Sequence, residues 1–597
     1  MNSDLRKKLS KIIDTLLAGG GINPVTCIEQ LSYLIYLKLL DEEESNPELH
    51  ELMASRKKTT RAETSASGAA AGTAAITAGM AGAAALAVIA FPLAIPLAIA
   101  AATGAFGSSH ARKLYPNQAE RYRWSSWRSK TGTELRDFVR DEVFPYMGSL
   151  IREQPQIAEY FRDATLEIAD PNVLKQVIDE LDSISFLKLG TDITGDIFEY
   201  ILIHIGQSSL SGKFRTPRQI RTMMVAMVDP DLGDAVCDPA CGTAGFLIDT
   251  VEHILAKYSE HVTEVPIYGE EWLDARQQTT AQAKNAIPNL QTYRKGAGEK
   301  IPSWDLLEHS VYGYDVSRQM MRIATMNLVL HGIRQANVTR ANSLSDIDGL
   351  SDEDVSRKYK IILSNPPLTG ALPSDSIRKD LPTTSKRSEL LFLAMMMESL
   401  APGGYCAVVI PEDLLFGSTS AHVQLRKKLL LDFEILAVIS LPKGVFKPYT
   451  GVKTAVLVFR KPEGKRSVDS VWFYDVRNDG YDPDEISGGG RFETPDQNDI
   501  PAMLATWQEY KQRCFTKPPG IEAGTTLASG MDEPRCWWAP VSIIADNEYN
   551  LAASRYKPLI TAKAPDEDPL ELIHETLALE REIAEGLEKL LKNLDAQ

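Results

Sequence analysis

The chain has 597 residues, of which 44% are apolar and 24% are charged, and its formal net charge at pH 7 is −16. This length exceeds what one hydrophobic core supports and predicts about two to four domains. The acidic excess excludes a protein that coats nucleic acid by itself, because phosphate binding depends on lysine and arginine. It leaves room for a local basic face, or for a partner that supplies positive charge.

The six cysteines are scattered without a C-x-x-C pair, which predicts reduced thiols and a cytoplasmic location. Cys237 and Cys241 lie close in sequence, but no histidine or second cysteine pair accompanies them, so we predict no metal site. The stretch MNSDLRKKLSKIIDTL carries charges throughout and differs from a signal peptide. No Walker A sequence is present, so nothing indicates an ATP-driven motor.

Residues 1–186 have the apolar spacing of helices and are predicted to form an N-terminal helical domain. The apolar positions recur every three or four residues, and they are Leu5, Leu9, Ile12, Ile13, Leu16, Ile28, Leu31, Leu34, Ile35 and Leu39. The stretch AGGGINPVT separates the two groups and is typical of a turn.

An apolar, alanine-rich insertion interrupts this domain. Residues 64–109 contain no charged residue, and basic residues flank them on both sides. The length and lack of charge are compatible with a membrane span, or with a hairpin of two small-residue helices. Pro92 and Pro96 would break a single span, and alanine is only weakly apolar. We therefore favour a low-complexity insertion that packs on the helical domain or stays disordered.

Residues 187–465 alternate short aliphatic runs with helical segments. The runs predicted as strands are DAVCDPACG, VYGYDV, YKIILSNPP, GYCAVVIP, FEILAVISLP and TAVLVFRK. Helices such as TAGFLIDTVEHILAKY, SRQMMRIATMNLVLHG and SELLFLAMMMESLAPGG are predicted between several of them. This alternation predicts an α/β domain with a mostly parallel, doubly wound sheet. Residues 257–310 have weak periodicity and are interpreted as an insertion.

The C-terminal part divides into a mixed extension and a predicted amphipathic helix. Residues 466–565 are rich in tryptophan, aspartate and glycine, and residues 566–597 carry the helix. Its apolar residues recur at spacings of three and four, and they are Leu579, Ile583, Leu587, Leu590 and Leu594. Such a seam suits a coiled coil with a partner. A helix that folds back on its own domain is an equal alternative.

The stretch VCDPACGTAGFL combines an acid at a strand end with a glycine turn. Asp238 ends the strand, and Gly242 and Gly245 lie in the turn before a helix. The next strand ends in Asp315, an acid suited to hydrogen-bond ribose hydroxyls; its alternative role is a helix N-cap. G-T-A-G differs from the dinucleotide pattern G-x-G-x-x-G, so an adenosine ligand without phosphates fits better.

The stretch IILSNPPLTG has a strand that must stop at Asn365, because Pro366 and Pro367 have no N–H to donate to a sheet. Pro-Pro fixes the backbone, so the Asn365 amide is held at the open end of the strand. The alternative for the three residues alone is a strand that ends in a plain turn. Beside the glycine loop, a plain turn is no longer the favoured interpretation.

Together, DPACGTAGF and NPPL resemble the S-adenosylmethionine-dependent amino-methyltransferases of DNA. More closely, the chain is similar to the modification (methyltransferase) subunit of type I restriction-modification systems, over residues 1–60 and 120–597. The segments that extend the resemblance are TGDIFEYILIHIG, GKFRTPRQI, MNLVLHGI, LPKGVFKPYTGVKTAVLVF, VWFYDVRNDGY and YNLAASRYKP. The order F-x-T-P, cofactor loop, NPP implies methylation of adenine at N6 rather than of cytosine at N4.

The resemblance implies a Rossmann-like methyltransferase domain and a set of site residues. The cofactor-binding residues that it implies are Phe214, Thr216, Pro217, Asp238, Ala240, Gly242, Thr243, Gly245, Phe246, Asp315 and Asn342, with S-adenosyl-L-methionine as the cofactor. The catalytic residues that it implies are Asn365, Pro366, Pro367 and Leu368, with the Asn365 side chain and the Pro366 carbonyl as the two acceptors.

Two positions depart from the family pattern. Leu368 stands where the family has an aromatic residue that stacks on the flipped base, which removes an interaction worth about 1–3 kcal/mol. Asn342 stands where family members usually have aspartate near the cofactor adenine. Both changes predict a slower or partner-dependent enzyme.

No pair of target-recognition domains follows residue 461, so the resemblance implies a separate specificity subunit that reads double-stranded DNA. It also implies a complex of two copies of this chain with one reader, and it allows a restriction subunit. The alternatives are methylation of an amide or amine in protein or RNA, and a methylase fold that only binds cofactor and partner in a defence complex. The apolar insertion adds a membrane tether as a further hypothesis.

Overall fold

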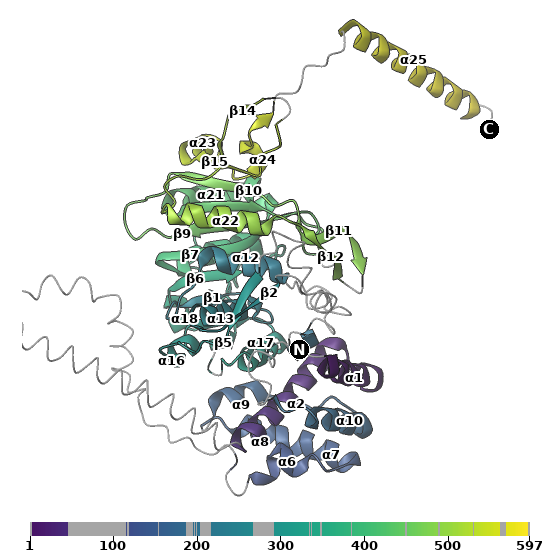
Figure 1. Cartoon of the computed structure of the whole chain (residues 1–597), viewed down its shortest axis with the longest axis vertical. Coiled ribbons are helices and arrows are strands. Elements are labelled where there is room, and N and C mark those ends of the chain that lie inside the picture. The colour runs from purple at the N-terminus through teal and green to yellow at the C-terminus, as the bar shows by residue number, and fades with distance from the viewer. Residues whose placement is uncertain are drawn as a thin grey trace, which may run out of the picture.

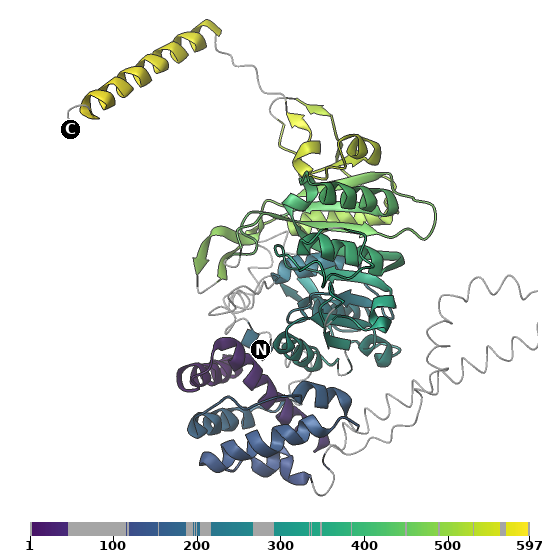
Figure 2. The same cartoon turned by 180° about the vertical axis from the view of Figure 1, so that it is seen from behind.

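The computed structural model describes residues 3–45, 119–186, 216–266, 292–447, 450–560 and 569–594, with Tyr115 and a few residues between 195 and 202. Within these ranges it leaves out residues 153, 334, 336, 347, 348, 384, 488, 489, 529 and 530. The molecule is elongated, with a helical domain at one end and a large sheet in the middle (Figures 1 and 2).

The N-terminal domain is helical, as predicted. Its helices are α1 (Ser3–Gly19), α2 (Pro24–Glu44), η1 (Glu120–Tyr122), α6 (Trp124–Trp127), α7 (Gly132–Phe138), η2 (Val139–Val143), α8 (Phe144–Ser149), α9 (Pro155–Phe161) and α10 (Pro171–Asp182). All ten apolar positions named in the sequence are buried in its core. Asn23 caps α2, because its side chain accepts a hydrogen bond from Thr26 N.

The second domain is built on a ten-stranded sheet with the order β13-β15-β10-β8-β9-β7-β6-β1-β4-β5. Its strands are β1 (Val236–Asp238), β4 (Val311–Asp315), β5 (Asn337–Arg340), β6 (Tyr359–Ser364), β7 (Leu400–Pro411), β8 (Glu434–Ser440), β9 (Thr454–Arg460), β10 (Ser470–Asp475), β13 (Ile521–Glu522) and β15 (Cys536–Pro540). From β5 to β10 every strand runs in one direction except β9, which is antiparallel to both of its neighbours. The six strands predicted from the sequence are therefore all present.

Helices cover the sheet on both faces, because alternate strand residues point to opposite sides. The connecting helices are α12 (Arg218–Val228), α13 (Gly245–Lys257), α16 (Trp304–Glu308), α17 (Arg318–Leu330), α18 (Asp352–Ser356), α19 (Ser388–Ser399), α20 (Glu412–Phe416), α21 (Ser420–Asp432) and α22 (Ile500–Gln512). Ile361 of β6 packs in a core with α12, α13 and α22, while the adjacent Ile362 packs in a separate core with α19 and α21. Burial on both faces explains the nearly continuous aliphatic runs.

The sheet continues beyond residue 465. The domain boundary predicted there falls between β9 and β10, which belong to the same sheet, and β13 and β15 extend it further. A hairpin of β11 (Asp479–Ser487) and β12 (Gly490–Asn498) leaves the sheet after β10 and projects from its side (Figures 1 and 2). The short elements that complete this region are α23 (Val541–Asp546), α24 (Ala553–Tyr556), β14 (Thr526–Leu527) and β16 (Leu559–Ile560).

The segment interpreted as an insertion, residues 257–310, holds a second hairpin. Its strands β2 (Val262–Pro266) and β3 (Thr292–Gly296) pair with each other and not with the large sheet. This agrees with the weak periodicity of the segment.

Helix α17 joins the two domains. Its Ala324 and Leu328 pack in the sheet core, whereas Met320 and Ile323 pack in the core of the helical domain. Since α17 starts directly after the end of β4, the helical domain is held next to the carboxyl edge of the sheet.

The last helix, α25 (Pro569–Leu594), extends away from the body in both views (Figures 1 and 2). Its Ile573, Leu579, Ile583 and Leu587 are all more than half exposed. Among the described residues no helix is long and apolar enough to cross a membrane. The apolar insertion at 64–109 lies outside the described residues.

Candidate active site

Three predicted site residues end neighbouring strands of the sheet. Asp238 ends β1, Asp315 ends β4, and Asn365 follows β6, with β1 between the other two strands. These strands are parallel, so their carboxyl ends meet at one edge. The chain passes from β1 to β4 on one side of β1 and later returns to β6 on its other side. In open α/β sheets, such a change of direction in the strand order opens a crevice at the carboxyl edge, where ligands bind.

Asp238 is a buried acid with neutral hydrogen-bond donors. Its side chain is 2% exposed and accepts from Ser364 Oγ at 2.7 Å and from Ala240 N at 3.1 Å. Burial, with a smaller effect of the nearby Asp315 charge, raises the pKa of Asp238 to about 7. In the part of the chain that the structure describes, no basic side chain forms an ion pair with it.

The glycine loop carries the backbone past these acids. Gly242 has φ +51° and its N–H donates to Asp315 Oδ2 at 3.2 Å. A Cβ atom built at Gly242 meets no atom within 4 Å, so described atoms leave space above the loop. The helix begins at Gly245, not at Thr243 as the sequence suggested, and the Thr243 carbonyl accepts from Asn327 Nδ2 at 2.9 Å.

The Asn365 amide has one satisfied end and one unsatisfied end. Its Nδ2 donates to Thr216 Oγ1 at 3.0 Å. Its Oδ1 is buried and has no hydrogen-bond partner among the described residues. A buried carbonyl oxygen without a hydrogen-bond donor costs about 1–3 kcal/mol of folding stability. This atom is therefore positioned to accept a hydrogen bond from a ligand.

The F-x-T-P segment therefore meets the N-P-P segment. Pro217 caps α12, and the Thr216 carbonyl accepts from Arg221 Nη1 at 3.0 Å. Phe214, also predicted as a cofactor residue, lies outside the described residues.

The other predicted residues differ in exposure. Pro366 is buried, and Pro367 is exposed at the end of the strand. Leu368 is 2% exposed and packs in the core on the α12 and α13 side of the sheet, and Phe246 of α13 is buried in that core too. In this structure Leu368 thus contributes to packing below the strand end.

Asn342 lies in the loop after β5, half buried, where its Oδ1 accepts from Leu344 N at 3.2 Å. The next residue, Ser343, donates through Oγ to the carbonyl of Pro239 at 2.7 Å. This bond ties the β5 loop to the loop that follows Asp238. The structure therefore brings Asn342 beside the predicted cofactor loop.

Sequence reasoning missed three supporting contacts. Ser364 binds Asp238, and a hydroxyl at the last position of a strand beside β1 was a usable signal. The buried pair between Arg221 and Asp249 (Nε to Oδ2, 2.8 Å) and the pair of Arg491 with Asp479 (Nη1 to Oδ2, 2.6 Å) join distant segments. Nothing in the local sequence predicts those two pairs.

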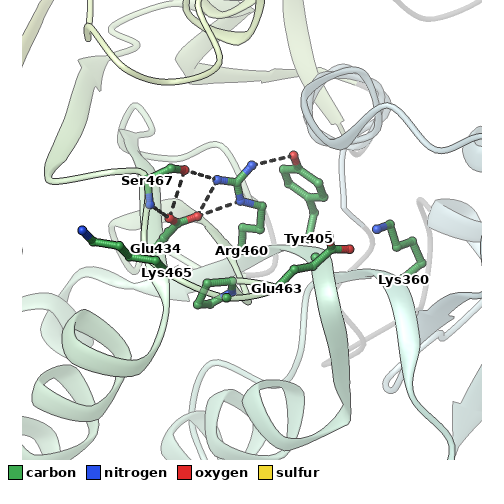
Figure 3. Close-up of a pocket in the computed structure, with 10 residues that line it drawn as sticks. Lys360, Tyr405, Glu434, Arg460, Glu463, Lys465 and Ser467 are labelled. Carbon is green, nitrogen blue, oxygen red and sulfur yellow. Dashed lines mark hydrogen bonds and ion pairs between the residues drawn. The ribbon is translucent and has the colours of Figure 1, made fainter. Parts of the chain in front are cut away.

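A pocket of about 580 Å³ lies at the opposite edge of the sheet (Figure 3). It is lined by Lys360 near the start of β6 and by Tyr405 within β7. Glu434 at the start of β8 and Arg460 at the end of the antiparallel β9 also line it. Glu434 is already satisfied, because it accepts from Arg460 Nε at 2.8 Å and from Ser467 and Val468 backbone N–H groups. This pocket is therefore separate from the candidate site.

The cysteines are all free thiols, and Cys237 and Cys241 are buried. Burial raises the pKa of both thiols, which keeps them protonated. Over the described ranges, no three histidine, cysteine, aspartate or glutamate residues are grouped so that they could hold a metal ion.

The raised pKa of Asp238 makes a stability prediction. The folded chain keeps a proton that the unfolded chain releases above its ordinary pKa near 3.8, so this site costs stability as pH rises from about 4 to 7. Asp238→Asn does not titrate. We expect its stability relative to wild type to increase by up to about 4 kcal/mol between pH 4 and pH 8. Urea unfolding of both proteins at these pH values measures this, and parallel pH profiles would contradict it.

Comparisons with known proteins agree with this geometry. The family model described as N-6 DNA Methylase matches residues 189–286 and 298–564, and the HsdM N-terminal domain model matches residues 5–181. The methylase subunit of the type I restriction enzyme EcoEI from Escherichia coli is 28% identical over 480 residues, covering 78% of this chain and 84% of that protein. The EcoKI methylase subunit from Escherichia coli K12 is 27% identical over 372 residues, covering 60% of this chain and 62% of that protein.

Solved structures show the same fold. A chain from a study of complex assembly and conformational transition of the type I R-M system has a TM-score of 0.61 at 23% identity, covering 100% of this chain and 99% of that chain. The type I methyltransferase subunit from Streptococcus thermophilus has a TM-score of 0.56 at 17% identity, covering 93% and 99%. The chain therefore belongs to the N-6 DNA methylase family, as a methyltransferase subunit of the type I restriction-modification kind.

Proposed function

We propose that this chain transfers a methyl group from S-adenosyl-L-methionine to the N6 amine of adenine in DNA, with the target sequence read by a separate specificity subunit. The family match and the type I relatives support the reaction class. The observation that carries the proposal is the unsatisfied, buried Oδ1 of Asn365 at the carboxyl edge of the sheet. An acceptor without a donor suits a substrate that brings N–H groups.

The loop residues fit the proposed cofactor. S-adenosyl-L-methionine has a positively charged sulfonium and ammonium, and it would supply an electrophilic methyl group. Asp238 offers a buried carboxyl without a basic partner in the described chain, and the space above Gly242 leaves room at the loop. Asp315 ends the adjacent strand, where an acid suits ribose hydroxyls.

Asn365 and Pro366 would activate the amine by accepting a hydrogen bond from each of its two N–H groups. The adenine amine is conjugated with its ring and is a poor nucleophile. Two fixed acceptors favour a pyramidal nitrogen with a localised lone pair. Pro366 and Pro367 restrict the backbone, so these acceptors are in place before substrate binds, which is the main source of rate in such a site. The product then loses its extra proton to solvent.

The proposal is tested by methyl transfer in the complex of this chain with its specificity subunit. Labelled S-adenosyl-L-methionine is incubated with unmethylated DNA from a strain that lacks the system, and the nucleosides are separated after digestion. We expect label only in N6-methyladenine. Label in cytosine, RNA or protein would overturn the proposal. Bound cofactor with no transfer to any acceptor would favour the alternative, a methylase fold that serves only to bind.

We also propose that the active complex contains two copies of this chain and one specificity subunit, with a restriction subunit as an optional partner. Double-stranded DNA is the substrate, and the acidic chain would leave base readout to its partner. The exposed apolar residues of α25 and the helical match at residues 5–181 support the two ends of the chain as contact regions.

The apolar side of α25 makes a prediction about assembly. Ile583 and Leu587 are each more than half exposed, and an aspartate on this seam cannot be buried against a partner helix without a large cost. We expect Ile583→Asp to weaken co-purification with the specificity subunit at least about tenfold. The control is Ala578→Asp, which introduces the same charge about 140° around the helix. Equal loss of co-purification in both variants, or no loss in Ile583→Asp, would contradict the proposal that the apolar side of α25 contacts the specificity subunit.

A further inference from the structure

The contact between Thr216 and Asn365 joins the two motifs of the site. We propose that the Thr216 hydroxyl is a positioning group for methyl transfer, because it holds the Asn365 amide with its oxygen toward the substrate amine. Asn365 Nδ2 donates to Thr216 Oγ1 at 3.0 Å, and Asn365 Oδ1 is left without a partner in the described chain. This inference rests on the proposed function and adds a role for a residue expected only to line the cofactor site.

An asparagine amide needs such a partner to face one way. The two ends of the amide are nearly equal in size, and rotation about its last bond is broad and roughly two-fold. If Nδ2 of Asn365 faced the substrate amine, its N–H groups would point at the N–H groups of the amine, and no hydrogen bond would form. In the structure the Thr216 hydroxyl accepts from Nδ2, which holds the amide in the opposite orientation. Only that orientation presents Oδ1 as an acceptor.

Thr216 is itself held on one side by a buried ion pair. The Thr216 carbonyl accepts from Arg221 Nη1 at 3.0 Å. Arg221 Nε in turn donates to Asp249 Oδ2 at 2.8 Å, and both side chains are at most 5% exposed. The side chain of Arg221 also fills the space that a Cβ at Gly245 would need, at 2.9 Å from Nε. The segment before α12 is thus fastened to α13.

A second buried ion pair holds the first turn of α12 from the other side. Gln219 Nε2 donates to Asp479 Oδ2 at 3.0 Å. Asp479 is fully buried and binds Arg491 through both of its oxygens, at 2.6 and 2.7 Å. The hairpin of β11 and β12 therefore anchors the turn that follows Thr216. Two such pairs around one short segment are expected where a side chain must stay within a narrow range of positions.

The test compares Thr216→Val with a matched variant in α12, the helix that follows it. Valine keeps the shape of threonine and removes the hydroxyl. Thr222 is as buried as Thr216, at 7% exposed, but its Oγ1 has no hydrogen-bond partner among the described residues. Thr222→Val therefore makes the same chemical change without breaking a described hydrogen bond. Both are measured in the complex with the specificity subunit and unmethylated DNA.

We expect Thr216→Val to lower the single-turnover rate of methyl transfer by about 10- to 100-fold at saturating S-adenosyl-L-methionine, as for a lost hydrogen bond at a buried group. The dissociation constant for S-adenosyl-L-methionine should stay within about threefold. Thr222→Val should keep the wild-type rate, and Thr216→Ser, which restores a hydroxyl, should recover most of it. Melting curves confirm that each variant is folded.

Three results would overturn the inference. These are a wild-type rate in Thr216→Val, a rate defect that saturating cofactor removes, and a Thr216→Ser variant as slow as Thr216→Val. The Asn365→Ala variant distinguishes a failure of the positioning role of Thr216 from a failure of the proposed function. If Asn365→Ala is inactive and Thr216→Val is fully active, only the positioning role is wrong. If Asn365→Ala transfers label at the wild-type rate, the proposed mechanism itself is wrong.

Discussion

Asn365→Ala is expected to lower the rate of methyl transfer by at least about 10²- to 10³-fold, the loss seen when one preorganised hydrogen-bonding group of an active site is removed. The variant keeps the strand and the Pro-Pro turn but loses the side-chain acceptor. Within the described residues the Asn365 side chain hydrogen-bonds to Thr216 and to neither loop acid, so cofactor affinity should change by less than about threefold. Single-turnover transfer and calorimetric binding of S-adenosyl-L-methionine measure the two quantities.

The control for this experiment is Asn547→Ala. Asn547 lies at the end of α23, remote from the carboxyl edge of β6 in sequence, and its amide bonds locally to Ile543 and Arg555. We expect the control to transfer methyl groups at the wild-type rate. Equal rates in wild type and Asn365→Ala would show that the amide is not an activating acceptor. A parallel loss of cofactor binding in Asn365→Ala would place the residue in the cofactor site instead.

Glu29→Gln is expected to destabilise the docking of the helical domain by about 3–5 kcal/mol, because it leaves Arg322 buried without a countercharge. Both residues are 7% exposed, and Arg322 Nη1 lies 2.6 Å from Glu29 Oε1. Glu29 also accepts from Gln319 Nε2 at 3.1 Å and from the Tyr33 hydroxyl at 2.9 Å. Urea unfolding with hydrogen exchange of α17 measures the effect, which should appear first as exchange at this helix.

An exposed ion pair between the same regions supplies the control. Arg318 of α17 pairs with Asp163, and both side chains are well exposed, at 39% and 70%. Exposed pairs contribute at most about 1 kcal/mol, so Asp163→Asn should leave the unfolding curve nearly unchanged. Asparagine also tolerates the positive backbone φ of residue 163. Equal effects of Glu29→Gln and Asp163→Asn would contradict a special role for the buried pair.

Much of the fold followed from local patterns in the sequence. The aliphatic runs became β1, β4 and β6 to β9, and the periodic segments became α1, α2, α13, α17 and α19. Asp238, Asp315 and Asn365 were assigned to strand ends because each follows a hydrophobic run and precedes a turn or helix. Parallel strands bring such ends to one edge, so even their proximity was predictable.

Other elements were not visible in the local pattern. The strands β10, β13 and β15 extend the sheet past residue 465, although their sequence was interpreted as a separate mixed extension. They are short, and β13 has two residues, so their hydrophobic pattern is too brief to identify a sheet partner. Leu368 stands where the family has an aromatic residue that stacks on the base, and its side chain is buried in the core on the α12 and α13 side; the local sequence did not indicate this packing.

The sequence by itself determined which segments form strands and helices, where the aliphatic strand must stop, and that an amide stands at that point, since these depend on side-chain periodicity and on the missing N–H of proline. Only the tertiary structure decided which groups surround the amide. Thr216 and Asn365 are 149 residues apart, Glu29 and Arg322 are 293 residues apart, and Gln219 and Asp479 are 260 residues apart. Such pairs form because the strand order and helix packing bring their backbones together, and no local pattern of residues encodes that proximity.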